Sequence, residues 1–105
     1  MAIGMLIDVP GGTQELYDRI NETMFGTSDP PPSDMPDGLI FHTAGPIPEG
    51  WRIFDVWESR DQFERFFEDR VVPAMQQVVG PGGGSDESGG PQIHELYRLE
   101  RRETA

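Results

Sequence analysis

Two periodicities of apolar positions alternate along the chain, and its first third shows one of each. Residues 2–8 form a short apolar run that a proline and two glycines follow, which predicts a buried strand and a turn. The next apolar residues recur every four positions, as on one face of a helix: Leu16, Ile20 and Met24. Thr13 is suited to cap this helix and Gly26 to end it.

The middle of the chain predicts a hairpin. Residues 39–44 and 51–57 are rich in β-branched and aromatic side chains, which are favoured in strands. The link between them, residues 45–50, holds two glycines and two prolines, so we expect a turn and antiparallel pairing. Residues 26–38 carry no periodic pattern and include three consecutive prolines, which predicts a surface loop before the hairpin.

A second helix follows the hairpin. Ser59 and Gln62 have the spacing of a capping box, which predicts a helix over residues 60–79. Its apolar residues hold one face: Phe63, Phe66, Phe67, Val71, Ala74, Met75 and Val78. Pro73 lies inside this pattern, and we expect it to kink the helix or to start a second segment, because proline lacks the helical N–H.

The element order is therefore β-α-β-β-α-β, with residues 92–99 as the last strand. This order predicts a single α+β domain over residues 1–105 with a ferredoxin-like fold: a four-stranded antiparallel sheet of order 4-1-3-2 with two helices on one face. Residues 26–38 and the glycine-rich 80–91 are expected to be flexible loops, and residues 100–105 a frayed tail.

The alternation along residues 51–57 divides the third strand into two faces. We expect Phe54 and Val56 to face the helices, which places the other set on the open face: Trp51, Ile53, Asp55 and Trp57. Ile40 and His42 join them there, because Leu39 and Phe41 make the better core pair. Two tryptophans side by side are too apolar to stay exposed in a soluble monomer. We therefore predict a homodimer in which two sheets pack face to face and close into a barrel.

The last strand leaves both orientations open. Ile93, Tyr97 and Leu99 suit the core, but Glu95 lies among them. The alternative face consists of His94, Leu96 and Arg98. The sequence therefore does not decide which face His94 and Glu95 occupy.

Charge and composition limit the chemistry. The net charge of −11 argues against nucleic acids and anionic membranes as partners, and no apolar run is long enough to span a bilayer. The N-terminus has no signal-peptide pattern, so we expect a cytoplasmic protein. The chain has no cysteine, and all eight basic residues are arginine, which excludes thiolate and Schiff-base chemistry.

His42 and Asp55 are the candidates for proton transfer. Histidine titrates near neutral pH, and a carboxylate in the middle of an apolar strand requires a partner. On neighbouring strands the two side chains lie near enough to contact each other or to share a ligand. The residues expected to bind that ligand are Trp57, Trp51, Ile40, Ile53, Arg52 and Tyr97. A purely structural role is the alternative for every one of these residues, and no metal site is expected, because His42 and His94 belong to opposite edge strands.

The segment HTAGPIPEGWRIFDVWESRDQFERFFEDRVVPAM, residues 42–75, resembles the dimeric α+β barrel superfamily. It is similar to the antibiotic-biosynthesis-monooxygenase-like branch, especially to small actinobacterial members. The resemblance implies a homodimeric barrel that acts on an aromatic or polyketide-like metabolite without a bound cofactor, as a monooxygenase or as a cyclase or isomerase. The alternative is a non-catalytic barrel that binds a small hydrophobic ligand or only assembles.

The chain also departs from patterns within that superfamily. Haem-binding members carry a histidine on the second helix, and residues 60–79 contain none. Quinone-forming monooxygenases use an asparagine, a tryptophan and an arginine. Trp57 and Arg52 match the last two loosely, and Asn21, the one asparagine of the chain, does not align with the first.

Overall fold

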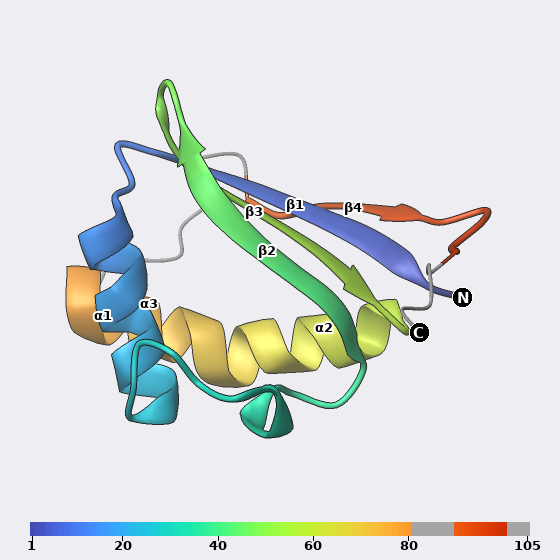
Figure 1. The fold of residues 1–105 in the computed structure, drawn as a ribbon, viewed down its shortest axis with the longest axis horizontal. Helices are drawn as coiled ribbons and strands as arrows, with labels where there is room; N and C mark the ends of the chain where they lie inside the picture. Colours follow the sequence, from blue (N-terminus) through green and yellow to red (C-terminus); the bar gives the residue numbers. More distant parts are fainter. Residues whose placement is uncertain (81–89, 101–105) are drawn as a thin grey trace, which may run out of the picture.

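The computed structural model describes residues 1–80 and 90–100 and has a sheet in one layer and helices in the other (Figure 1). The strands are β1 (Ile3–Pro10), β2 (Leu39–Ile47), β3 (Gly50–Trp57) and β4 (Gln92–Glu95). The helices are α1 (Gln14–Phe25), α2 (Arg60–Phe66) and α3 (Val72–Val79), with a 3₁₀ turn η1 (Pro32–Asp34) and a π-helical turn η2 (Phe67–Val71).

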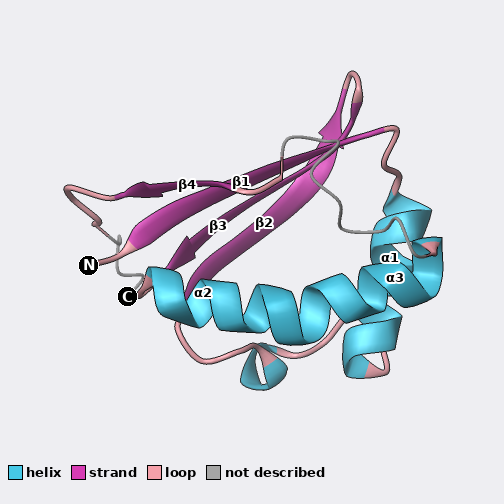
Figure 2. Cartoon of the chain, turned by 180° about the vertical axis from the view of Figure 1, so that it is seen from behind, coloured by secondary structure: helices cyan, strands magenta, loops and turns pink. Residues whose placement is uncertain are grey.

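All neighbouring strands pair antiparallel, in the order β2-β3-β1-β4. Taken from the other edge this is the predicted order 4-1-3-2. The architecture is α+β, with a four-stranded antiparallel sheet whose one face the helices cover, and it is compatible with a ferredoxin-like plan (Figure 2). Among the described residues, no helix combines the length and apolarity that crossing a bilayer requires.

The predicted ends of α1 are confirmed. The Thr13 hydroxyl accepts a hydrogen bond from the Leu16 N–H at 3.1 Å, as an N-cap does. Gly26 adopts a left-handed φ of 78°, and its N–H donates to the Glu22 carbonyl at 2.8 Å. A residue with a Cβ would be strained in that conformation, so glycine is suited to end the helix.

The second helical region is interrupted as Pro73 predicts. Ser59 caps α2 by accepting from the Gln62 N–H at 3.2 Å, and its hydroxyl donates to Gln62 Oε1 at 2.9 Å, so the N-cap of the predicted capping box is confirmed. Pro73 lies in the first turn of α3, directly after the π-helical turn. Because proline has no N–H to donate, the α-helical bond across this point cannot form, and the chain widens before a new helix starts.

The predicted orientation of the sheet is wrong. Trp57 and Asp55 are only 1% and 5% exposed and lie on the face that the helices cover, whereas Phe54 is 37% exposed on the opposite face. The rings of Phe63 and Phe66 pack against Trp57, with centroids 5.6 and 5.7 Å away. Alternation along a strand defines two faces but does not specify which one faces the helices. The contacts of Phe63 and Phe66 with Trp57 place the tryptophan face inside. The correction applies to five of the six residues predicted for the open face: Trp51, Ile53, Asp55, Trp57 and His42.

A β-bulge changes the predicted alternation of β2. Leu39 pairs with Trp57 and His42 pairs with Asp55, so both lie on the helix side although their separation in sequence is odd. The register shift between Leu39 and Phe41 makes this possible, because a bulge inserts one extra residue into the strand. Phe41 consequently lies on the open face and is not part of the core, contrary to the expected Leu39–Phe41 pair.

β4 is shorter than predicted, and it settles the orientation that the sequence left open. Ile93 pairs with Met5 and packs against the core, whereas His94 lies over Gly4 on the open face. Tyr97 follows the strand and is fully exposed. The loop of residues 26–38 contains η1. The expected flexibility of the glycine-rich segment and the fraying of the tail fall on residues 81–89 and 101–105, which lie outside the described residues.

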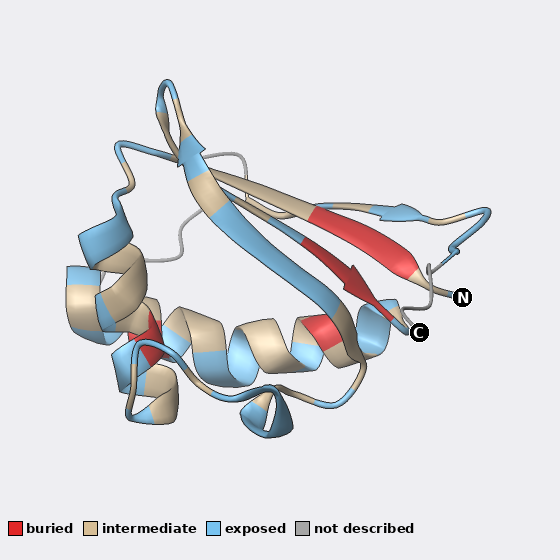
Figure 3. Cartoon of the chain, in the orientation of Figure 1, coloured by how far each residue is buried: buried red, intermediate tan, exposed pale blue. Residues whose placement is uncertain are grey.

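The core lies where β1 and β3 cross α2. Its buried cluster consists of Ile3, Met5, Trp57 and Phe63. Figure 3 shows the buried segments of β1 and β3 side by side at this end of the sheet, with most of β2 and β4 exposed or half-buried. The tightly packed core therefore occupies one end of the contact between the two layers.

Candidate functional site

A cavity of about 760 Å³ lies between the sheet and the helices. Its walls are mostly apolar. The sheet supplies Met5, Ile7, Val9, Ile53 and Trp57, α1 supplies the predicted stripe of Leu16, Ile20 and Met24, and the second helical region supplies Phe63, Phe66, Phe67, Val71 and Met75. This volume falls within the roughly 300–1,000 Å³ of sites that bind small molecules. The apolar stripe that predicted α1 thus lines this cavity.

His42 and Asp55 meet directly at the wall of this cavity. They are opposite each other in the β2–β3 register, and His42 Nδ1 lies 2.7 Å from Asp55 Oδ1. Trp57 donates its indole N–H to the other carboxylate oxygen, Oδ2, at 3.2 Å. The contact predicted between His42 and Asp55 is confirmed, but it lies on the helix side of the sheet and not on the open side.

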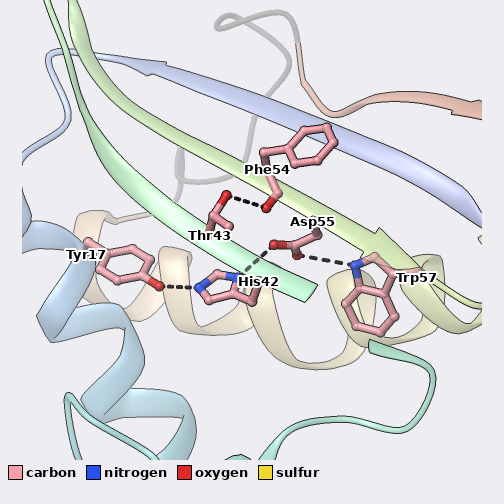
Figure 4. Close-up of polar contacts among 6 residues, drawn as sticks. All are labelled: Tyr17, His42, Thr43, Phe54, Asp55 and Trp57. Carbon is pink, nitrogen blue, oxygen red and sulfur yellow. Dashed lines mark hydrogen bonds and ion pairs between the residues drawn. The ribbon is translucent and has the colours of Figure 1, made fainter. Parts of the chain in front are cut away.

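Tyr17 extends this pair into a chain of three groups. Its hydroxyl forms a hydrogen bond with His42 Nε2, as Figure 4 shows. The carboxylate of Asp55 can only accept a hydrogen bond, so His42 Nδ1 donates to it. In a neutral imidazole Nδ1 therefore carries the hydrogen and Nε2 has the lone pair. The Tyr17 hydroxyl is therefore the donor to Nε2, and both ring nitrogens of His42 are occupied.

Burial keeps the Tyr17 hydroxyl protonated. Burial is the largest cause that raises the pKa of Tyr17, and the negative charges of Asp55 and Asp18 raise it further. A hydrogen bond with Asn21, itself a buried residue, opposes this shift by stabilising the phenolate. With a pKa above its ordinary value near 10, Tyr17 is a hydrogen-bond donor throughout the neutral pH range.

Aromatic rings hold Tyr17 in place. Its ring is nearly parallel to the His42 ring, with centroids 6.0 Å apart, and it packs against Trp51 at 5.3 Å. Trp51 also lines the cavity, and its indole nitrogen is buried without a hydrogen-bond partner among the described residues. Tyr17 is thus fixed between a wall of the cavity and the histidine.

The structure does not bring all the predicted ligand-binding residues together. Trp51, Ile53 and Trp57 line the cavity with His42 and Asp55. Arg52 instead forms two hydrogen bonds, of 2.7 and 2.9 Å, with Asp8 on the open face. Ile40 lies at the bulge and is not among the cavity residues, and the exposed Tyr97 lies away from it.

Sequence reasoning missed Tyr17 as a functional residue, and it considered Asn21 only for a family role with which it does not align. Both belong to α1, and their spacing of four residues puts them on one helical face. That spacing was the available signal, since a tyrosine and an asparagine at the edge of an apolar stripe are two polar groups directed towards the same side. Their contact with β2 depends on how the helix packs on the sheet, which periodicity does not specify.

No protein-family model matches the chain, and no curated protein matches it by sequence. The resemblance to the dimeric α+β barrel superfamily therefore has no support beyond the fold. Within residues 1–80 and 90–100, no three metal-binding side chains gather in a group that could hold an ion. The cavity and the three polar groups at its wall are the features of the chain that bear on its function.

Proposed function

We propose that the protein is an enzyme that binds an aromatic or polyketide-like metabolite in the cavity and removes a proton from it. The reaction is that of a cofactor-independent monooxygenase-like enzyme or of a cyclase or isomerase. The observation that carries the proposal is the Tyr17–His42–Asp55 chain at the wall of a large apolar cavity. Sites that bind small molecules combine such walls with a few placed polar groups.

The charge of the lining favours a neutral ligand. The described residues that line the cavity include two carboxylates, Asp29 and Asp55, but no arginine, and the sequence has no lysine. An anionic ligand would therefore be buried without a cationic partner other than a protonated His42, which is unfavourable. The aromatic walls suit a planar ring system, because aromatic pairs gain from offset and edge contacts.

The geometry suits His42 as the acceptor of the proton. Asp55 fixes the tautomer in which Nε2 has a lone pair, and its carboxylate stabilises the imidazolium that forms when the proton arrives. Trp57 donates a hydrogen bond to the second carboxylate oxygen of Asp55 and so keeps the Asp55 side chain in one orientation. Proton removal is common to both reaction classes, since an electron-rich anion can react with oxygen or be protonated again at another atom.

Deuterium exchange tests this function without knowledge of the natural substrate. The probe is β-tetralone, a neutral bicyclic ketone with an acidic C–H beside its carbonyl, in heavy water, with proton NMR as the readout. We expect the wild-type protein to accelerate the exchange and His42→Asn to reduce that acceleration by about 100-fold, the lower range for a general base. His94→Asn is the matched control, because it changes the other histidine of the chain, on the open face.

Two results would contradict the enzyme proposal. One is an exchange rate in His42→Asn equal to that of the wild type. The other is binding of β-tetralone by the wild-type protein with no accelerated exchange, which would favour the alternative of a non-catalytic protein that binds a small hydrophobic ligand.

We also propose that a second copy of the chain covers the open face of the sheet. Phe54 and Phe41 are 37% and 40% exposed on that face. Leu6 is the cross-strand partner of Phe54, and Val56 is that of Phe41. Two exposed aromatic rings on one sheet face are typical of a surface that another molecule covers. A two-fold dimer would bring each such face against its equivalent.

A further inference from the structure

We propose that the Tyr17 hydroxyl, and not His42, is the group that exchanges a proton with the ligand, and that the ligand is a neutral enolisable ketone or its enol. This inference rests on the proposed function, because it concerns the same site. It adds the residue that touches the ligand and the chemical class of that ligand.

His42 has no vacant nitrogen with which to contact a ligand. Nδ1 is 2.7 Å from Asp55 Oδ1, and Nε2 accepts the hydrogen bond from Tyr17. Asp55 is equally occupied, since its second oxygen accepts from Trp57 at 3.2 Å. A proton that leaves a ligand can therefore reach His42 only through the hydroxyl of Tyr17, whose side chain lines the cavity.

The transfer balances without an oxidant, a reductant or a cofactor. The ligand's C–H or O–H bond breaks as its proton moves to Tyr17 Oη, and the original Tyr17 proton moves to His42 Nε2 in the same step. The products are an enolate in the cavity and an imidazolium that Asp55 stabilises. Return of the proton along the same path to a different atom of the ligand completes a keto–enol isomerisation.

The environment of Tyr17 favours this linked transfer over ionisation of Tyr17 alone. A Tyr17 phenolate would be half-buried near Asp55 and Asp18, and both charges raise the pKa of the phenol. The hydroxyl can give up its proton to His42 only if it gains another from the ligand. The ligand must therefore be neutral and weakly acidic, as an enol or the C–H beside a ketone is, because a permanent anion would place a third negative charge there.

Tyr17→Phe separates this relay from direct contact between the ligand and His42. The substitution retains the ring that packs on Trp51 and removes the hydroxyl. With β-tetralone as the probe, we expect the accelerated deuterium exchange to fall about 100-fold, as in His42→Asn, and the binding constant to change less than about threefold. Because the two residues act as a unit, the double variant should lose no more than either single one.

Tyr97→Phe is the matched control, because Tyr97 is the other tyrosine of the chain and is fully exposed. Exchange that falls in His42→Asn but persists in Tyr17→Phe would overturn the relay and leave the proposed function in place. Undiminished exchange in both His42→Asn and Tyr17→Phe would overturn the relay and the proposed function together. No accelerated exchange by the wild type would do the same.

Fluorotyrosine keeps the proposal testable if Tyr17→Phe does not fold. In the Tyr97→Phe background, biosynthetic incorporation labels Tyr17 alone. We expect the fluorine NMR signal to shift as β-tetralone saturates the cavity, because the ligand contacts the labelled ring. An unchanged signal at saturation would overturn the proposal.

Discussion

At Tyr17, burial and two nearby carboxylates act on one hydroxyl group. Their combined effect is a pKa above that of a tyrosine in the unfolded chain, where the value is about 10. Below that pH both states keep the proton, so Tyr17 adds no pH dependence. Above it the unfolded chain loses the proton first, and the free energy of unfolding falls as the pH rises towards the pKa of the folded state.

We therefore predict that ionisation of Tyr17 causes part of the decrease in the free energy of unfolding at alkaline pH. Denaturant unfolding of Tyr97→Phe, which retains Tyr17, should show a steeper fall above about pH 10 than Tyr17→Phe, by at most about 1.4 kcal/mol per pH unit, the value for one proton. Equal slopes in the two variants would show that the hydroxyl of Tyr17 titrates as in the unfolded chain.

The ends of the helices and the pairing of the hairpin strands could be predicted from the local sequence. The caps at Thr13, Gly26 and Ser59 and the break at Pro73 were predictable, because each depends on residues within one helical turn. The contact between His42 and Asp55 was also predictable, since hairpin pairing places them opposite each other.

The face of the sheet was not predictable in the same way. Which side is inside depends on the helix aromatics that pack against Trp57, and those contacts are distant in sequence. The bulge beside Ile40 carries no glycine or other local signal, yet it reverses Phe41 relative to Leu39. The site was therefore found as a pair of residues, whereas its location and its third member, Tyr17, depended on tertiary packing.

Association of two copies concerns the whole molecule. The net charge of −11 opposes contact between two chains over most of their surface, so a dimer requires an apolar patch such as the one around Phe54. We predict that sedimentation will find twice the chain mass at micromolar concentration, and that Phe54→Glu will shift the protein to a monomer, because an unpaired carboxylate would be buried in the interface.

Leu99→Glu is the control for added charge, since Leu99 is also exposed (39%) but lies beyond β4. It should leave the dimer intact. A wild-type protein that sediments as a monomer at the same concentration would contradict the dimer, as would a Phe54→Glu variant that remains dimeric.

Both proposals for the site depend on one hydrogen-bonded chain of Asp55, His42 and Tyr17, and nitrogen NMR of the His42 imidazole reports on it. In His94→Asn, His42 is the remaining histidine, so its two nitrogen signals are unambiguous. With the imidazole neutral, we expect a hydrogen on Nδ1 and a lone pair on Nε2 that accepts from Tyr17. Tyr17→Phe should then shift the Nε2 signal and leave Nδ1 protonated. A hydrogen on Nε2, or the averaged signals of two rapidly exchanging tautomers, would show that this hydrogen-bonded chain does not form.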